Sequence, residues 1–191
     1  MAPRKKEDFK EMQEISRKKI LMAAFELFAI HGYTRTSVDS IAAKAKISKG
    51  LIYHYFSSKQ DILKNLFGLL LKETAVMMQW SESLSPEEYM QRMIDFSVNY
   101  IVQKPKINRL MMALVLQPEV MKGLKKDFDK MRIVWMSALT DLFKKLKMED
   151  PEGEAYLFGA IFDGMSVGYL TLGEEYPVKN MKKLIEKRYG L

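Results

Sequence analysis

The chain has no cysteine and only two histidines, His31 and His54. Disulfides and cysteine-based metal sites are therefore excluded, and two imidazoles are too few for a convincing metal site. The sequence also lacks a phosphate-cradling glycine loop and paired carboxylates with a recognisable partner, so we do not expect an enzyme or a cofactor. The first 19 residues are dominated by charge and carry no export signal. These absences predict a cytoplasmic protein without a metal.

Positive charge is concentrated in the N-terminal third. Residues 1–60 hold 12 Lys and Arg against 6 Asp and Glu, whereas residues 61–191 hold 19 against 18. A basic segment joined to a nearly neutral remainder is typical of phosphate binding by one domain and a different task for the other. The basic arm Pro3–Lys6 fits contact with phosphates or a minor groove, and equally fits a solvated terminus.

An amphipathic helix is predicted over about residues 9–30, followed by a short stop. Ile20, Leu21, Ala24 and Phe28 belong to its apolar stripe. Gly32 suits the left-handed conformation of a helix C-cap, and we interpret the preceding His31 as a structural residue at the negative helix end.

Two short helical patterns follow between Thr36 and Lys59, separated by a break at Ile47–Ser48. Thr36 or Ser37 is expected to cap the first helix and Ser48 the second, because hydroxyl oxygens accept hydrogen bonds from unpaired N–H groups at helix starts. Gly50 is expected to allow close approach of a neighbouring backbone. This arrangement predicts a helix-turn-helix.

The second of these helices leaves Lys49, Tyr53 and His54 on its exposed side. Donors and flat side chains on a short helix suit the major groove of DNA, where they reach phosphates and base edges. The same residues also fit the ordinary surface of a small helical bundle.

These motifs resemble the TetR-type bacterial transcriptional regulators. The resemblance lies in His31-Gly32-Tyr33, Thr36-Ser37, Ile41-Ala42 and the run from Gly50 to Lys59, and it covers about residues 17–66. It implies a homodimer that pairs through its last two long helices, and a fourth helix that links effector binding to the DNA-binding domain.

The predicted DNA-binding residues fall into two groups. Base edges are within reach of Lys49, Gly50, Leu51, His54 and Tyr55, although Tyr55 is equally suited to the core. Contacts with phosphates are predicted for Ser37, Lys46, Ser48, Lys49, Tyr53 and Lys59. Thr36, at the start of the first short helix, is included among the predicted DNA-binding residues.

The remainder is predicted to be helical over residues 59–80, 86–103, 105–117, 118–147, 152–173 and 177–189. Methionine and aromatic residues are frequent there and fit either a pocket for an apolar or flat ligand or a plain core. The candidate effector-pocket residues are Met77, Phe96, Tyr100, Met111, Met131, Trp135, Phe162, Met165 and Tyr169.

Small residues recur every four positions along residues 154–172, at Ala160, Gly164 and Gly168. Because glycine is costly inside a helix, close approach of a second helix is the expected compensation, and we predict a dimer interface here. A membrane span is the rival interpretation, which Asp163 interrupts. Asp163 itself suits a cationic effector, an ion pair across the dimer, or solvent.

The sequence therefore predicts an all-α protein, with a helix-turn-helix DNA-binding domain over 1–60 and a helical effector-binding and dimerisation domain over 61–191. Its expected function is that of a homodimeric regulator, most simply a repressor that a small effector releases from a palindromic double-stranded operator. The alternative is an architectural DNA-binding protein that responds to no ligand.

Overall fold

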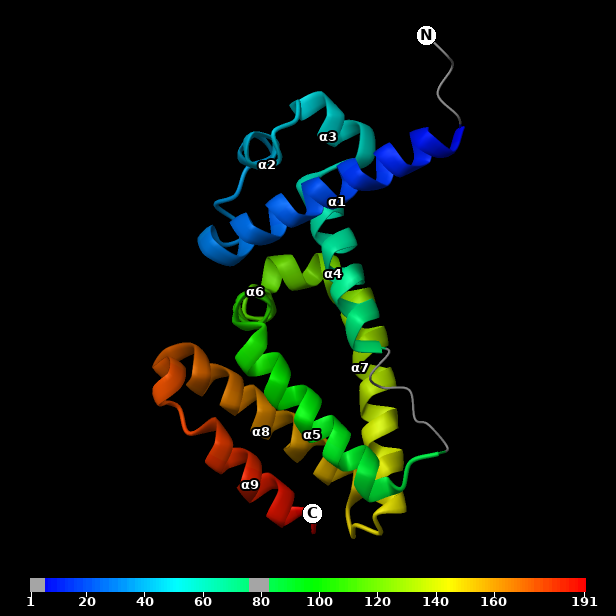
Figure 1. Cartoon of the computed structure of the whole chain (residues 1–191), viewed down its shortest axis with the longest axis vertical. Coiled ribbons are helices and arrows are strands. Elements are labelled where there is room, and N and C mark those ends of the chain that lie inside the picture. Colours follow the sequence, from blue (N-terminus) through cyan, green and yellow to red (C-terminus); the bar gives the residue numbers. More distant parts are fainter. Residues whose placement is uncertain (1–5, 76–82) are drawn as a thin grey trace. The chain divides into compact units, whose positions relative to one another are not determined.

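A computed structural model describes residues 6–75 and 83–191, and Figure 1 shows that these residues form helices and connecting turns. No strand occurs within these two ranges, so the predicted all-α class is confirmed. Met77 lies outside them, as does most of the basic N-terminal arm. The helices are α1 (Lys6–His31), α2 (Val38–Ala45), α3 (Lys49–Tyr55), α4 (Lys59–Ala75), α5 (Pro86–Gln103), α6 (Pro105–Val115), α7 (Pro118–Lys145), α8 (Pro151–Leu172) and α9 (Val178–Arg188), with a 3₁₀ turn at Gly173–Glu175.

The described chain divides into two compact units. One runs to Leu70 and includes Met112–Gly123, and the other comprises Leu71–Met111 and Leu124–Leu191. Helices α4, α6 and α7 therefore contribute residues to both units. The functional boundary predicted between residues 60 and 61 stays a prediction.

The first unit is built around the apolar face of α1, against which α2 packs. Ile20 and Phe28 of α1 are buried together with Ile41 of α2 and Ile52 of α3. Gly32 ends α1 with a φ of 80°, and its N–H donates to the Phe28 carbonyl over 3.0 Å. The left-handed C-cap predicted at this position is confirmed.

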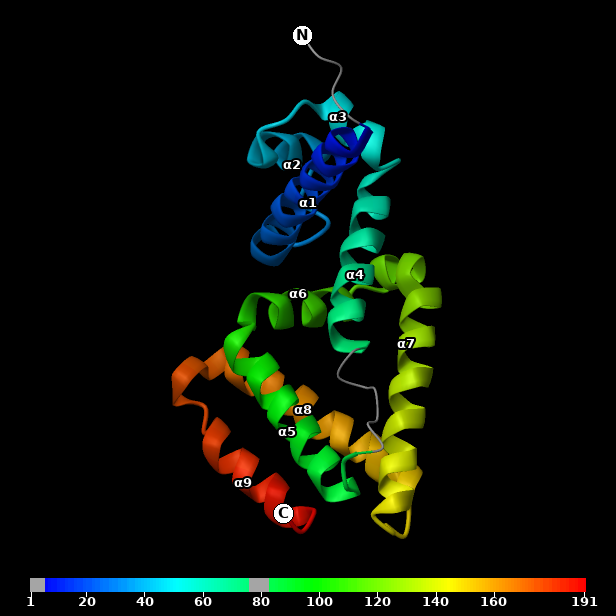
Figure 2. The same cartoon turned by 45° about the vertical axis from the view of Figure 1, so that its right-hand side comes forward.

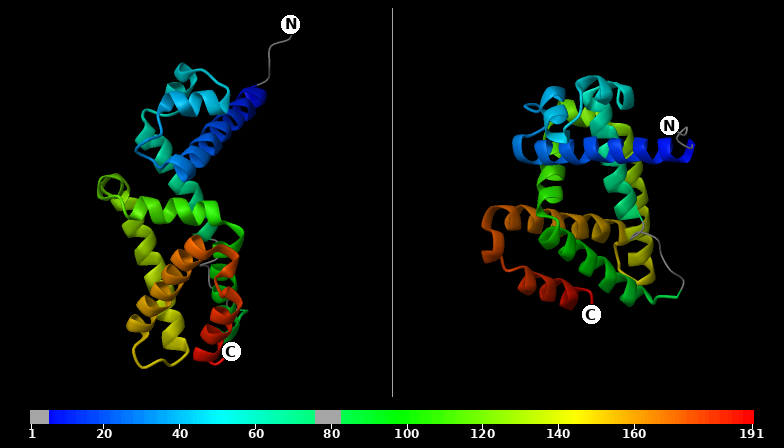
Figure 3. Two further views of the ribbon diagram at one scale, coloured as in Figure 1. Left: turned by 90° about the vertical axis from the view of Figure 1, so that its left-hand side faces the viewer. Right: turned by 45° about the horizontal axis from the view of Figure 1, so that its top comes forward.

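The second unit is a helical layer in which α5 lies against α8 and α9, as Figures 1 and 2 show. Phe143 of α7 and Phe158 of α8 are buried in its core, and their rings pack edge to face with centroids 6.0 Å apart. Tyr189 closes the same cluster, 5.4 Å from Phe143. Figure 3 shows α8 in orange and α9 in red beside the green α5.

Polar contacts fix α9 at two points. Glu154 on α8 accepts hydrogen bonds from Arg188 over 2.9 Å and from the Tyr189 hydroxyl over 3.2 Å. On α5, Asp95 lies 2.6 Å from the ammonium of Lys182. The last helix is thus tied to both neighbours that it covers.

Candidate nucleic-acid interface

Side-chain caps define the start of both short helices. The Ser37 hydroxyl accepts a hydrogen bond from the Ser40 N–H over 3.0 Å, and the Ser37 N–H donates to the Ser40 hydroxyl over 3.1 Å. Ser48 caps α3 by accepting from the Leu51 N–H over 3.1 Å. Between them Lys46 takes the left-handed conformation, with a φ of 55°, which turns the chain sharply from α2 into α3. The predicted helix-turn-helix is therefore present, and Ser37 rather than Thr36 is its first cap.

Helix α3 has one buried side and one exposed side. Ile52 and the following Phe56 are buried, whereas Lys49, Tyr53 and His54 are accessible, with half of the Tyr53 surface exposed. A helix held by two apolar anchors can present its opposite face as a rigid surface. The structure therefore exposes three of the side chains that were predicted to contact DNA.

Leu51 and Tyr55 are half-buried, in keeping with the alternative kept open for Tyr55. The Tyr55 ring meets that of His54 edge to face, with centroids 5.0 Å apart. A Cβ added to Gly50 would meet only the Ser48 hydroxyl, at 4.0 Å. The close backbone approach predicted at Gly50 is therefore absent within the described chain.

Two predicted DNA contacts instead turn toward the protein. Thr36 is 3% exposed, and its hydroxyl donates to the Gly32 carbonyl over 2.8 Å, so its assignment to the DNA surface requires correction. The Lys59 ammonium donates to the carbonyls of Tyr33 and Thr36 over 2.9 and 2.8 Å, and burial lowers its pKa. Lys59 would have to give up these bonds to reach a phosphate, and its DNA contact stays a prediction.

Arg17 is a structural contributor that the sequence patterns did not reveal. Its guanidinium donates to the Asn65 side chain over 2.8 Å and lies 4.8 Å from the centre of the Phe56 ring. Arg17 thereby joins α1 to α4 and to the end of α3. Helical periodicity could not predict these contacts, because Phe56 and Asn65 are 39 and 48 residues away from Arg17 in the sequence.

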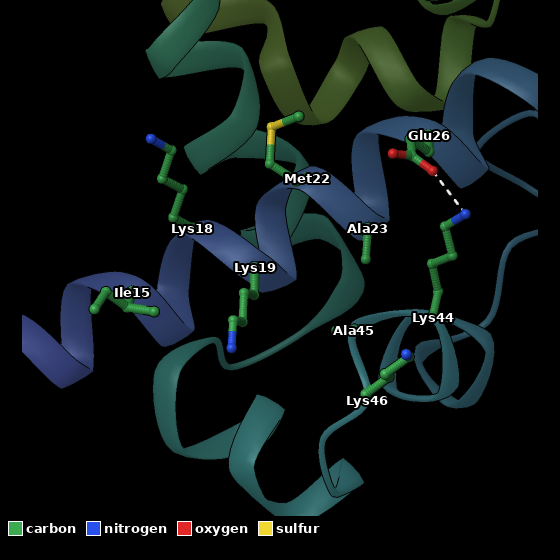
Figure 4. Close-up of a pocket in the computed structure, with 9 residues that line it drawn as sticks. All are labelled: Ile15, Lys18, Lys19, Met22, Ala23, Glu26, Lys44, Ala45 and Lys46. Carbon is green, nitrogen blue, oxygen red and sulfur yellow. Dashed lines mark ion pairs between the residues drawn. The ribbon is translucent and has the colours of Figure 1, made fainter.

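A basic cavity of about 530 Å³ opens between α1 and the end of α2. The ammonium of Lys44 lies 2.7 Å from the Glu26 carboxylate, and Figure 4 shows this pair together with Lys18 and Lys19, which extend to different sides of α1. Lys46 adds a further positive charge to the lining. The cavity therefore has a net positive charge beside the helix-turn-helix, which favours anions such as phosphates.

The candidate effector-pocket residues belong to the second unit wherever the structure describes them. Met165 is buried in the core, and Trp135, Phe162 and Tyr169 pack against that core while staying partly accessible. Phe96, Tyr100, Met111 and Met131 are half-buried, and the Phe96 and Tyr100 rings are 6.1 Å apart. Met77 lies outside the described residues. Their role as a ligand site stays a prediction.

Helix α8 carries an uncovered apolar face. Tyr156 is 55% exposed and Val167 is 52% exposed, and Ala160 and Gly164 lie between them on the same side of the helix. An added Cβ at Gly164 would meet no atom within 4 Å, whereas one at Gly168 would collide with the Tyr176 ring. The small size of Gly168 is therefore required by packing within the chain.

The segment Pro151–Glu175 is also long and apolar enough to cross a membrane, with a mean hydropathy of 1.2. Such a helix is weak evidence for a span, because core and interface helices of globular proteins share this composition. Asp163 lies on its accessible side, and desolvation by its surroundings raises the pKa of its carboxyl.

Known sequences that are similar to this chain match it mainly in the N-terminal unit. The family model described as "Bacterial regulatory proteins, tetR family" matches residues 20–66. The HTH-type transcriptional regulator HbdR of Aromatoleum sp. is 47% identical over 53 residues, which are 28% of this chain and 23% of HbdR. An HTH-type transcriptional repressor of Streptomyces coelicolor is 31% identical over 98 residues, covering 51% of this chain and 48% of that protein. The chain thus spans from about a quarter to a half of these relatives.

Solved structures extend the similarity of fold to nearly the whole chain. A transcriptional regulator from Rhodococcus sp. Rha1 matches with a TM-score of 0.78 at 17% identity, covering 91% of this chain and 94% of that one. A putative transcriptional regulator from Saccharomonospora viridis, solved in complex with choline, matches with a TM-score of 0.72 at 18% identity, covering 91% and 95%. The family model, the related sequences and the helix-turn-helix agree in the N-terminal unit, where residues 20–66 are similar to the tetR family of bacterial regulatory proteins.

Proposed function

We propose that the protein is a homodimeric transcriptional regulator that binds a palindromic operator through α3, and that a small molecule in the second unit releases it. The observation that carries this proposal is the exposed side of α3, which presents Lys49, Tyr53 and His54. The other side of the helix is buried at Ile52, and Ser48 caps the N-terminus of the helix. Such a helix inserts into the major groove, where lysine reaches phosphates and guanine acceptors.

The uncovered face of α8 supports the homodimer. Exposed apolar residues at Tyr156, Leu157 and Val167 surround Ala160 and Gly164, which leave room for a second helix. Exposed apolar side chains along one side of a helix are typical of a protein interface, and a two-fold axis would bring the same side of a second copy, including its Asp163, against it. Two α3 helices related by this axis would read an inverted repeat.

Release by an effector requires coupling between the second unit and the helix-turn-helix. Residues Met112–Gly123, from the end of α6 and the start of α7, belong to the unit that contains α3. Within it, the Thr34 hydroxyl donates to the Gln117 side chain over 3.2 Å, and Gly123 lies against the side chain of Gln60. A ligand that favours one position of this segment would change the spacing of the two α3 helices.

We propose a small apolar or aromatic effector because Trp135, Phe162 and Tyr169 are partly accessible beside the second core. The Saccharomonospora regulator, which has the same fold, was solved in complex with choline, and this supports a small-molecule ligand for a protein of this fold. In the repressor interpretation, the ligand-bound form has the lower operator affinity.

Duplex binding measured by fluorescence anisotropy at several salt concentrations tests the DNA-binding proposal. Lys49→Ala should weaken binding and lower the slope of log K against log salt, because a cation at the DNA interface is lost. Lys125→Ala, on the exposed surface of α7, is the control. Unchanged affinity and slope for Lys49→Ala would show that Lys49 does not contact the DNA. Binding that lacks sequence preference and responds to no ligand would favour the architectural alternative.

A further inference from the structure

An ion pair joins the two helices of the helix-turn-helix. The ammonium of Lys49, at the start of α3, lies 2.9 Å from each carboxylate oxygen of Asp39, in the first turn of α2. Both side chains are at the surface, with 51% of Lys49 and 68% of Asp39 exposed. The principal cation of the proposed DNA-reading face therefore already has an anionic partner in the free protein.

Asp39 is the only acidic residue between Glu26 and Asp61. It occurs on the surface that has to approach a polyanion, where a negative charge opposes binding. Lys49 stands at the positive end of α3, where a helix disfavours a cation, and the hydrogen bond that its ammonium donates to Asp39 raises the pKa of Lys49. The carboxylate thus holds the ammonium in a position that the helix alone would not favour.

We propose that Asp39 is a specificity-determining residue, which keeps Lys49 directed at base edges and weakens its contact with the phosphates of noncognate DNA. This inference rests on the proposed function. A phosphate that contacts Lys49 has to bring its negative charge close to the Asp39 carboxylate or displace that carboxylate. Base edges present neutral acceptors, such as guanine O6 and N7, which the remaining donor capacity of the ammonium can satisfy while the pair stays intact.

The test compares two duplexes bound by the full-length protein: one enriched from a random pool and one of scrambled sequence. Asp39→Asn should tighten binding to the scrambled duplex about two- to fivefold, the scale of an exposed ion pair, and steepen its salt slope by about 1. Binding to the enriched duplex should change little, so the ratio of the two affinities should fall.

A matched control breaks a similar pair elsewhere. Asp129 lies 2.7 Å from the Lys125 ammonium on α7, and both affinities should be unchanged in Asp129→Asn. A double-mutant cycle then asks whether Asp39 acts through Lys49, in which case Asp39→Asn should have a much smaller effect in a Lys49→Ala background.

An equal effect in both backgrounds would show that Asp39 acts only as a distant charge and would overturn the inference. An unchanged affinity ratio in Asp39→Asn, with a wild type that still prefers the enriched duplex, would overturn it while leaving the proposed function intact. A wild type that prefers no duplex would remove both.

Discussion

The Lys59 ammonium donates a hydrogen bond to the carbonyl oxygen of Thr36 over 2.8 Å, which fastens the start of α4 to the loop before α2. The ammonium also donates to the carbonyls of Tyr33 over 2.9 Å and of Thr34 over 3.3 Å, and it lies 4.4 Å from the centre of the Tyr33 ring. This geometry assigns Lys59 a structural task within the helix-turn-helix unit, in place of the free cation that its position in the motif suggested.

Lys59→Met should therefore lower the free energy of unfolding by about 1–2 kcal/mol, since charge-assisted hydrogen bonds to the loop carbonyls are lost. The midpoint of urea unfolding measures this change. Lys64→Met, at an exposed position of the same helix, provides the control and should leave the midpoint unchanged. A stable Lys59→Met protein whose DNA-binding salt slope falls by about 1 would instead make Lys59 a phosphate contact.

The two glycines of α8 should respond differently to substitution. Gly164→Leu adds bulk to an open position on the uncovered face and should shift a dimer toward monomer in sedimentation velocity. Gly168→Ala should keep its association state but lose about 1–3 kcal/mol of stability, because the new methyl group meets the Tyr176 ring. Gly159→Leu, at another open position of α8 on a different side, is the control for helix propensity. Gly164→Leu that remains fully dimeric would exclude this face from the interface.

Asp163 should make stability depend on pH. Desolvation raises the pKa of the folded carboxyl above its ordinary value of 3.8, so ionising it at neutral pH opposes folding. Asp163→Asn should therefore raise the melting temperature at pH 7. The gain should shrink as the pH falls through the folded pKa and vanish below 3.8, where the carboxyl is protonated in both states. A lower melting temperature at pH 7 would point to an ionic partner for Asp163, such as one across the dimer.

Local patterns predicted the helices well because their signals are short-range. The hydroxyl caps at Ser37 and Ser48, the left-handed glycine at Gly32 and the prolines at the starts of α5 and α8 each act within one turn. Helix bounds therefore agree with the predicted ranges to within a few residues in the described chain.

Side-chain destinations were harder to predict because they depend on contacts that are distant in the sequence. Lys59 bonds to carbonyls 23 and 26 residues away, and Gly168 is small because Tyr176 folds back over it. The motif placed Lys49 on the exposed face of α3, yet periodicity contained no information that Asp39 would hold it. The sequence offered one sign of this ion pair, which is that Asp39 is the only acidic residue between Glu26 and Asp61.

The most direct test of sequence-specific binding is selection of bound duplexes from a random DNA pool by the purified full-length protein at moderate salt, read out by sequencing. We predict enrichment of one inverted repeat, whose two halves correspond to the α3 helices of a two-fold dimer. An absence of any enriched motif, with binding that disappears as the salt concentration rises, would contradict sequence-specific regulation and leave only nonspecific attraction to phosphates.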